Sequence, residues 1–273
     1  MDASLIQTKF EKLGARAKLR PLVRNRWRPA AGPIVIDIGH DRRGEFFDIQ
    51  SDDDAEVLVL DVQPKDRHLL LMVRQPAERR GLADRKDKFL CGHDERHWFV
   101  AGVPERAAVS SVITAKEALK PEFVRALESG KKGKRKNRHR RKTGTFIRQG
   151  EWFFIPARGI VADDKFVLYN EPLRRGRGKP HTCERLFRVG GTTVYVCHRY
   201  PNGLVEKEYK SLLKRNPAAL KWNWQVMKRD PTVFIRGAVS HADHATIHLD
   251  CWHRVAMNTE NQSRAMASVA FLD

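Results

Sequence analysis

Apolar and polar residues alternate in four short segments near the start of the chain. These segments are Ile34–Ile38, Glu45–Gln50, Glu56–Val62 and His68–Arg74, and turn-forming sequences such as SDDDA separate them. A period of two residues places successive side chains on opposite faces of an extended strand. Because the segments begin eleven to twelve residues apart, they favour consecutive antiparallel strands. The pattern predicts a β-meander or a small barrel in this part of the chain.

Helical patterns are fewer than strand patterns. Residues 4–19 predict a basic amphipathic helix, and residues 114–129 predict a helix that Pro121 interrupts. Thr114 opens a T-x-x-E capping box, which favours a helix start at that residue. Residues 205–215 predict a further helix.

Short segments rich in β-branched and aromatic residues predict more strands in the second half. Residues 144–155 contain a Gln-Gly turn signal between two such segments. Gly190-Gly191 lies between residues 185–189 and residues 192–198, and this arrangement predicts a hairpin. A last strand is expected at residues 267–272.

Together these patterns predict an α+β fold that is mostly antiparallel β, in meander or small barrel-like sheets, with a few helices. We expect four units along the chain. They are a basic N-terminal helix and connector at 1–33, a β-rich unit ending in a helix at 34–130, a basic loop at 131–143, and an α+β unit at 144–273.

The positive charge of the chain is concentrated in two short stretches. Lys and Arg exceed Asp and Glu by 52 − 33 = 19. Residues 131–142 (KKGKRKNRHRRK) supply nine of these charges, and residues 174–179 supply four more. Clustered Lys and Arg bind polyanions because counterions are released from the phosphates. The predicted phosphate contacts are Lys131, Lys132, Lys134, Arg135, Lys136, Arg138, Arg140, Arg141, Lys142, Arg174, Arg175, Arg177 and Lys179.

This clustering predicts a protein that binds nucleic acid, either RNA or DNA, by gripping the phosphate backbone. The run at 131–142 has no aromatic residue, so it is expected to hold phosphates and not to read bases. The protein is expected to act without catalysis, alone or with protein partners in a ribonucleoprotein or other nucleoprotein complex. The alternative for the run itself is a solvated loop with no specific partner.

A second hypothesis is a metal-dependent nuclease or another phosphoryl-transfer enzyme. The segment 241–253 (HADHATIHLDCWH) is dense in side chains that ligate metals. Nucleases use such groups to hold a divalent ion that polarises phosphate and activates water. In this hypothesis the ligands or the base are Asp243, His244, His248 and Asp250. In the same segment, alternation predicts that His253 is a hydrogen-bonded core residue.

A zinc site is a further alternative. The predicted hairpin at Gly190-Gly191 would bring the HTC and CH sequences together, with His181, Cys183, Cys197 and His198 as the ligands. Their spacing differs from the usual x2–x4 pattern, and neighbouring strand residues face opposite ways. A pair of buried thiols is therefore the simpler interpretation. No cofactor is firmly implied, although zinc or magnesium would suit these groups.

Several enzyme classes are disfavoured because their motifs are missing. The sequence contains no GxxxxGK[ST], GxGxxG, GxSxG, HExxH or CxxC pattern. Residues 1–20 lack the apolar core of a signal peptide, and no apolar run is long enough for a membrane span. The four cysteines are widely spaced. We expect a cytoplasmic or nucleoid-associated protein with reduced thiols.

Overall fold

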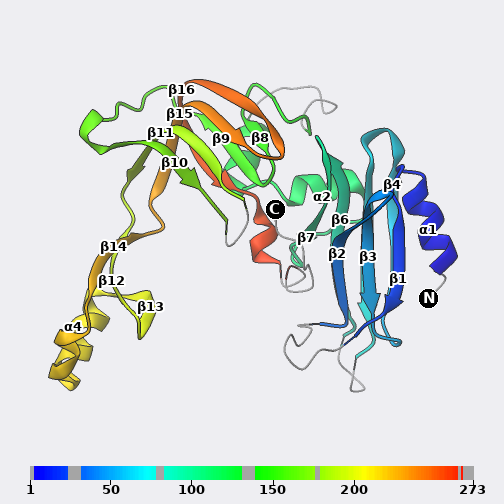
Figure 1. Ribbon diagram of the computed structural model, residues 1–273, viewed down its shortest axis with the longest axis horizontal. Helices are drawn as coiled ribbons and strands as arrows, with labels where there is room; N and C mark the ends of the chain where they lie inside the picture. The colour runs from blue at the N-terminus through cyan, green and yellow to red at the C-terminus, as the bar shows by residue number, and fades with distance from the viewer. Residues whose placement is uncertain are drawn as a thin grey trace.

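Most of the described chain is antiparallel β-sheet. Figure 1 shows a β-rich N-terminal half (residues 3–130), a β-rich C-terminal half (residues 139–263), and an arm (residues 192–229) that projects from the C-terminal half. None of the helices in the described ranges is long and apolar enough to cross a bilayer. The computed structural model describes residues 3–23, 32–77, 83–130, 139–175, 179–263 and 266.

Seven strands form two sheets in the N-terminal half. One sheet has the order β1-β3-β2, and the other has the order β4-β5-β6-β7. Consecutive strands pair antiparallel within β2-β3 and from β4 to β7. The segments expected as one meander at residues 34–74 are instead divided between the two sheets, because β3 does not pair with β4. The strands are β1 (Ala17–Pro21), β2 (Ile34–Asp41), β3 (Gly44–Ser51), β4 (Glu56–Gln63), β5 (His68–Gln75), β6 (Arg85–Asp94) and β7 (His97–Val103).

Burial on both faces explains the continuous apolar run in β5. Leu69 and Leu71 belong to a core that both sheets share. Leu70 points the other way and packs in a second core with Val112 of the helix α2 (Val112–Ala118). A strand that is covered on both faces carries apolar residues at successive positions instead of every second one.

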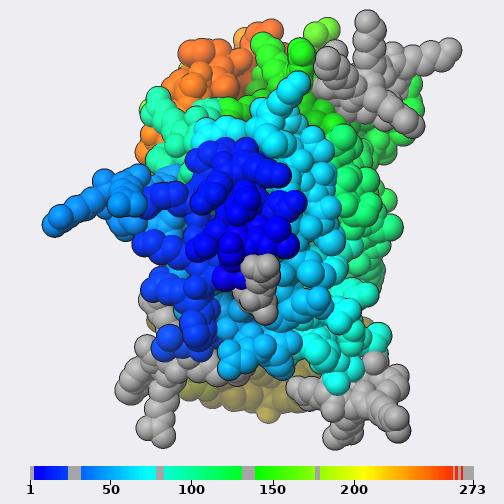
Figure 2. Space-filling view, turned by 90° about the vertical axis from the view of Figure 1, so that its right-hand side faces the viewer, coloured from blue at the N-terminus to red at the C-terminus, as the bar shows by residue number. Residues whose placement is uncertain are grey.

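The N-terminal helix is shorter than predicted. α1 (Ala3–Glu11) buries Ile6 and Phe10, and Figure 2 shows it on the outer face of the N-terminal half. Residues 17–21 form β1, which pairs in parallel with β3. The predicted helix over 4–19 is therefore wrong beyond Glu11, because pairing with a strand later in the chain overrides the local periodicity.

Pro121 separates two helices, as predicted. α2 is followed by α3 (Glu122–Ser129). The first of them starts earlier than expected, because Ser111 caps it. The Ser111 Oγ accepts from the Thr114 backbone N–H at 3.2 Å, and the Thr114 Oγ1 accepts from the Ser111 backbone N–H at 3.0 Å. Thr114 is thus the third residue of this helix and not its cap.

The C-terminal half contains one antiparallel sheet of six strands, with the order β10-β11-β15-β16-β9-β8. Its core includes Phe154, Leu186 and Ile235, which are fully buried. The strands are β8 (Ile147–Gln149), β9 (Trp152–Pro156), β10 (Val167–Leu173), β11 (His181–Val189), β15 (Thr232–His241) and β16 (His244–Met257). This half also contains the short 3₁₀ turns η3 (Asp164–Phe166) and η5 (Thr259–Gln262), and the N-terminal half contains η1 (Pro64–Asp66).

The two halves are in direct contact. Val124 of α3 and Phe153 of β9 belong to one buried core cluster. After β16, the Thr259 Oγ1 donates to the Ala118 carbonyl at 2.7 Å, and the Ser263 Oγ donates to the Val103 carbonyl at 3.0 Å. These contacts fix the walls of the cavity described below. The division of the chain at residues 131–143 stays a prediction, and the strand expected at 267–272 lies outside the described residues.

The arm replaces the predicted hairpin at Gly190-Gly191. Both glycines have positive φ, of 71° and 84°, but the chain continues outward from β11 into β12 instead of turning back. The hairpin prediction is wrong, because the partners of these strands come from β14 and β15 further along the chain. The arm consists of β12 (Thr192–Cys197), β13 (Tyr200–Val205), α4 (Glu206–Arg215), the 3₁₀ turn η4 (Pro217–Lys221) and β14 (Gln225–Arg229).

Candidate functional site

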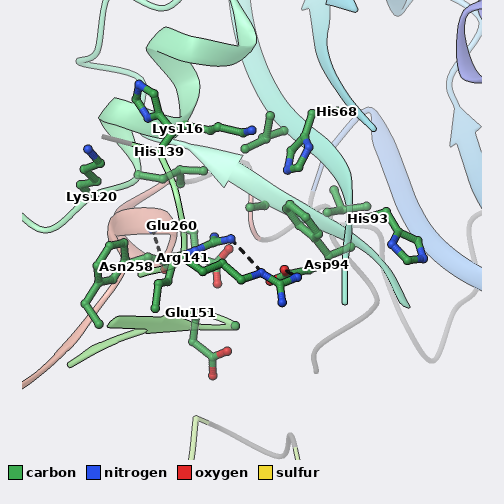
Figure 3. Close-up of a pocket in the computed structure, with 18 of the residues that line it drawn as sticks. His68, His93, Asp94, Lys116, Lys120, His139, Arg141, Glu151, Asn258 and Glu260 are labelled. Carbon is green, nitrogen blue, oxygen red and sulfur yellow. Dashed lines mark hydrogen bonds and ion pairs between the residues drawn. The ribbon is translucent and has the colours of Figure 1, made fainter. Parts of the chain in front are cut away.

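A cavity of about 1100 Å³ lies between the two halves. Strands β6 and β7 and helix α2 line it from the N-terminal half, and residues 139–153 and 243–260 line it from the C-terminal half (Figure 3). Sites for small molecules have volumes of about 300–1,000 Å³. The cavity is therefore large enough for part of an extended substrate.

The charges that line this cavity are balanced. Six Lys or Arg and six Asp or Glu residues face it. Arg141 forms ion pairs with Asp94 and Glu95, and Arg148 lies 3.5 Å from Asp94. The large positive excess of the chain therefore lies outside the cavity. Further ion pairs on the wall join Lys116 to Asp66, Lys120 to Glu128 and Arg175 to Glu260.

Burial of polar groups gives the wall a distinct electrostatic character. Burial, assisted by the Lys116 ammonium, lowers the pKa of His68 to about 4, and burial also lowers the pKa of His139. Burial and the neighbouring Arg148 guanidinium lower the pKa of Arg141 to about 10. The histidines are therefore neutral at pH 7, and the two guanidiniums repel each other. An anionic group that entered beside them would relieve this repulsion.

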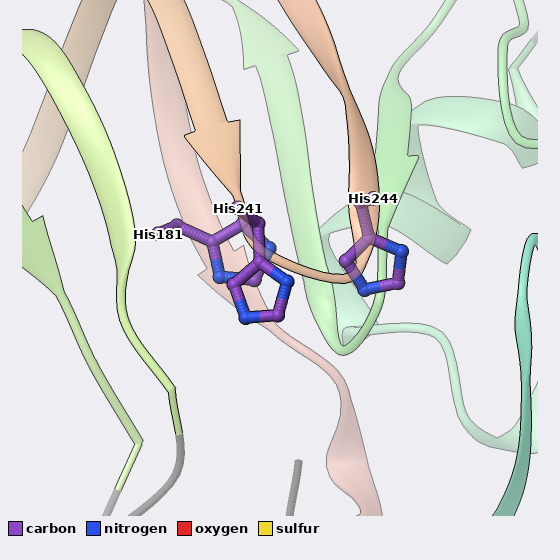
Figure 4. A group of neighbouring side chains, drawn as sticks. All are labelled: His181, His241 and His244. Carbon is purple, nitrogen blue, oxygen red and sulfur yellow. The ribbon is translucent and has the colours of Figure 1, made fainter.

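Three histidines meet at the edge of the cavity (Figure 4). His181 is the first residue of β11, His241 is the last of β15, and His244 is the first of β16. Each offers one ring nitrogen, and these three atoms lie within 4.8 Å of one another. His244 and its neighbour Asp243 line the cavity. The three rings thus come from three adjacent strands and lie together beside the cavity.

Strand register explains this convergence. β11 and β15 are antiparallel, and Thr182 pairs with Ser240, so His181 lies next to His241. β15 and β16 form a tight hairpin in which His241 pairs with His244. Residues that oppose each other in an antiparallel pair point to the same face of the sheet. Two strand pairings therefore place three imidazoles on one face at one edge.

His181 is buried without a polar partner. Its exposed fraction is 2%, and neither of its ring nitrogens has a hydrogen-bond partner among the described residues. Burial and the adjacent rings of His241 and His244 lower the pKa of His181 to about 3. A neutral imidazole with free nitrogens is the form that ligates a metal. An unpaired buried polar group costs stability, and a bound cation would remove that cost.

The surroundings of His244 resemble the outer shell of a metal ligand. The Glu95 carboxylate lies 3.4 Å from the His244 Nδ1 and also accepts from the Ala245 backbone N–H at 2.8 Å. A carboxylate on one imidazole nitrogen orients the ring and leaves its other nitrogen for the metal. Gly150, with a φ of 55°, leaves space beside this other nitrogen, since a Cβ atom there would lie 3.4 Å from the His244 Nε2.

His241 is held by two longer hydrogen bonds. Its Nδ1 accepts from the Asp243 backbone N–H at 3.1 Å, and its Nε2 lies 3.3 Å from the Lys179 carbonyl. Ligation of a cation would replace one of them. Asp243 itself is paired with the Lys179 ammonium at 2.8 Å. Partial burial alone would raise the pKa of Asp243, but Lys179 lowers it below the ordinary value.

The predicted phosphate contacts fall into three groups. Arg140, Lys142 and Arg174 are exposed. Arg141, Arg175 and Lys179 instead form ion pairs with carboxylates at the cavity. The remaining predicted contacts lie outside the described residues and are Lys131, Lys132, Lys134, Arg135, Lys136, Arg138 and Arg177.

The predicted catalytic and metal-binding residues are separated by the fold. Asp243 and His244 lie at the cavity, whereas His248 and Asp250 are exposed further along β16. His181 joins the cluster of three histidines. The other three zinc candidates do not: Cys183 is buried in the sheet core, and Cys197 and His198 lie in the arm.

The buried thiol of Cys183 has a different environment from a metal ligand. Burial and the Glu171 carboxylate raise its pKa to about 12, which keeps the thiol protonated. His253 is 3% exposed, and its Nδ1 donates to the Cys251 carbonyl at 2.8 Å, so it is the predicted core histidine.

Sequence reasoning missed the partnership of His181 with His241 and His244, and the role of His68 and His139 in the cavity. A correct prediction that β11 pairs with β15 would have brought His181 next to His241.

None of the family models, curated proteins or solved structures that were compared matches this chain. A function is therefore argued from the site itself.

Proposed function

We propose that this protein is a metal-dependent hydrolase that cleaves phosphodiester bonds in nucleic acid. In this proposal His181, His241 and His244 hold one divalent transition-metal ion. The observation that carries it is the convergence of three imidazole nitrogens within 4.8 Å beside a large cavity, with His181 buried and unpaired among the described residues.

The ligand chemistry favours zinc or a similar ion over magnesium. Imidazole suits zinc, copper, iron and nickel, whereas magnesium prefers oxygen ligands in an octahedral arrangement. Structural zinc sites use four protein ligands, while catalytic zinc sites use three and leave one position for water or substrate. Three histidines beside a cavity correspond to the catalytic arrangement.

The cavity provides groups for the rest of the reaction. Hydrolysis transfers a proton from the attacking water and delivers one to the leaving oxygen, as the new P–O bond forms and the old one breaks. Asp243 is a carboxylate that can accept the first proton. Burial raises the pKa of Glu151, and a raised carboxyl pKa suits the second role, that of proton donor. Arg141 and Arg148 line the cavity, and in this proposal their guanidinium groups stabilise the phosphate charge.

The substrate class follows from the net charge. A chain with an excess of 19 positive charges attracts polyanions, and most of that excess lies outside the balanced cavity. A nucleic acid fits both facts, because its backbone extends beyond the bond that is cleaved. The proposal assigns the flanking phosphates to the basic residues of 131–142 and 174–179 other than Arg141, Arg175 and Lys179, which pair with carboxylates.

The proposal is tested with single- and double-stranded DNA and RNA in the presence of Zn²⁺, Mn²⁺, Mg²⁺ or EDTA. We expect cleavage with a transition-metal ion and none with EDTA. His244→Ala is expected to lower the rate by about 100-fold or more, since a metal ion contributes several kcal/mol to such a reaction. His248→Ala is the matched control on the same strand and should cleave as wild type does. Cleavage that survives both EDTA and His244→Ala contradicts the proposal.

A second candidate is binding of nucleic acid without cleavage. The observation that favours it is the concentration of nine Lys and Arg residues at 131–142, of which Arg140 and Lys142 are exposed. Neutralising Lys134, Arg135, Lys136, Arg138 and Arg140 together should lower the log–log salt slope of binding by about 4. Tight binding with this salt response, and no cleavage with any ion, would favour the second candidate.

A further inference from the structure

The arm places a small module away from the body of the protein. It is a ribbon of three strands in the order β13-β12-β14, with α4 at its outer end (Figure 1). Gly191 sits where the ribbon leaves the main sheet, and a Cβ atom there would lie 2.8 Å from the Arg229 carbonyl. The close approach of the two strands at this point requires glycine.

The arm has almost no core of its own. The structure describes all residues from 192 to 229, and only Val194, Cys197 and Ala219 among them are buried. All five residues of β14 are exposed, including Val226 with 66% and Met227 with 50% of their surface open. A module that existed only to complete the fold would bury such residues, so its surface is more consistent with binding.

Five aromatic side chains form a partly open stack at the end of the arm. Tyr195 and Tyr209 stack face to face with ring centroids 4.0 Å apart. Trp224 packs edge-on against Tyr209 at 4.9 Å, and Trp222 and Tyr200 continue the stack at 6.3 Å. None of the five is buried. Aromatic faces that stay accessible are suited to stacking on unpaired bases.

The arm also carries a large share of the net charge. Residues 192–229 contain eight Lys or Arg and two acids, Glu206 and Glu208, so their net charge is 8 − 2 = +6 of the total +19. Lys207, Lys210 and Lys214 follow the spacing of one face of α4 and are exposed. The Arg199 guanidinium carbon lies 4.3 Å from the centre of the Trp222 ring, so cation and aromatic face occur together.

We propose that the arm binds single-stranded nucleic acid, with the lysines of α4 and Arg199 on the phosphates and Trp222 stacked on a base. The inference rests on the proposed function for its ligand class. The arm would add a second contact to the same substrate, far from the cavity. The combination of clustered cations and open aromatics fits a single strand, because the bases of a duplex are already stacked.

The main test compares two variants of the full-length chain. One carries Lys207→Gln, Lys210→Gln and Lys214→Gln on exposed helical positions, where glutamine keeps the helix propensity. The control variant removes the same charge from exposed positions on the body and carries Lys12→Gln, Lys65→Gln and Lys86→Gln. Fluorescence anisotropy with a labelled 30-nucleotide single strand, at several salt concentrations, measures the affinity.

The arm variant is expected to bind at least about tenfold more weakly, with a salt slope lower by about 2, from about 0.7 per lost phosphate contact. The control variant should bind as wild type does. Trp222→Ala should weaken binding to the single strand by about fivefold or more and leave binding to a duplex unchanged. Wild-type affinity and slope in the arm variant overturn the inference, as does a preference for vesicles of anionic phospholipid over the single strand.

A small phosphodiester separates this inference from the proposed function. The arm variant should hydrolyse bis(p-nitrophenyl) phosphate at the wild-type rate and cleave a long single strand more slowly. Equal cleavage of the long strand by wild type and arm variant overturns the inference and leaves the proposed function standing. If wild type hydrolyses neither compound but the arm variant binds the strand more weakly, the proposed function fails and the inference holds.

Discussion

His181, the first residue of β11, stacks on His241, the last residue of β15, with ring centroids 4.3 Å apart and ring planes 24° from parallel. His244 completes the group at 4.8 Å from His241. Two strand pairings hold these rings together, and the burial of His181 keeps it neutral. This relationship is the basis of the proposed metal centre.

Replacement of His181 by phenylalanine is expected to separate metal binding from folding. In EDTA the His181→Phe variant should be as stable as wild type or more stable, by up to about 3 kcal/mol, because an unpaired buried imidazole is removed. With Zn²⁺ at a hundred times its Kd, wild type should gain about 2.7 kcal/mol and the variant nothing. Urea unfolding measures both values. The control His248→Phe should keep the gain, and the same gain in His181→Phe would contradict the assignment.

Gly150 is expected to tolerate no side chain. Its φ of 55° is strained for other residues, and its position faces the His244 Nε2. Gly150→Val should lower the free energy of unfolding by about 1 kcal/mol or more and weaken zinc binding. Gly144→Val is the control, since a Cβ atom at Gly144 has no neighbour within 4 Å. Unfolding and zinc titrations that do not distinguish the two variants would show that Gly150 has no such role.

Glu95 is expected to act as a positioning residue for His244. It lies 3.4 Å from the Nδ1 of that ring and belongs to the other half of the protein. Glu95→Gln should weaken zinc binding by about 10- to 100-fold, as is usual for outer-shell groups, and keep the hydrogen bond from Ala245. Isothermal titration gives the affinity, and Glu122→Gln on the exposed start of α3 is the control. An unchanged affinity in Glu95→Gln would remove this residue from the site.

His68 is expected to make stability depend on acid pH. It is 8% exposed, its Nδ1–H donates to the Asp66 carbonyl, and burial lowers its pKa to about 4. As the pH is lowered below 6.5, the unfolded chain binds a proton at His68 before the folded chain does. The free energy of unfolding therefore decreases as the pH decreases, and it becomes constant below about pH 4. The loss from this residue is about 3 kcal/mol between pH 7 and pH 4.

Urea unfolding of wild type and His68→Gln across this range measures that loss. The variant should be less stable at pH 7 and show a flatter profile. His248→Gln, which replaces an exposed histidine, should follow wild type. Parallel profiles for wild type and His68→Gln would mean that His68 is not held neutral in the folded protein.

Local patterns predicted the strands of the N-terminal half well. Alternation in IVIDI and the apolar run HLLLMVR became β2 and β5, and Pro121 ended a helix as expected. The helix prediction for residues 17–19 was wrong, because the strand at residues 17–21 forms only by pairing with β3. The same local sequence fits one face of a helix. The α+β class and the four expected units remain predictions.

The site was only partly predictable for the same reason. The density of metal-ligating residues in the segment 241–253 indicated Asp243 and His244 as candidates, because these residues lie close together in the sequence. His181 was grouped instead with cysteines near it in the chain, because the pairing of β11 with β15 spans the whole arm. The cavity depends on docking of the two halves, and no local pattern encodes the contact of Glu95 with Ala245.

The zinc content of the purified protein tests the three-histidine centre most directly. The chain is saturated with Zn²⁺, passed through metal-free buffer, and measured by inductively coupled plasma mass spectrometry. Wild type and His248→Ala should each retain about one zinc per chain, whereas His181→Ala, His241→Ala and His244→Ala should retain almost none. Zinc absent from wild type, or retained equally by His181→Ala, would contradict the metal centre.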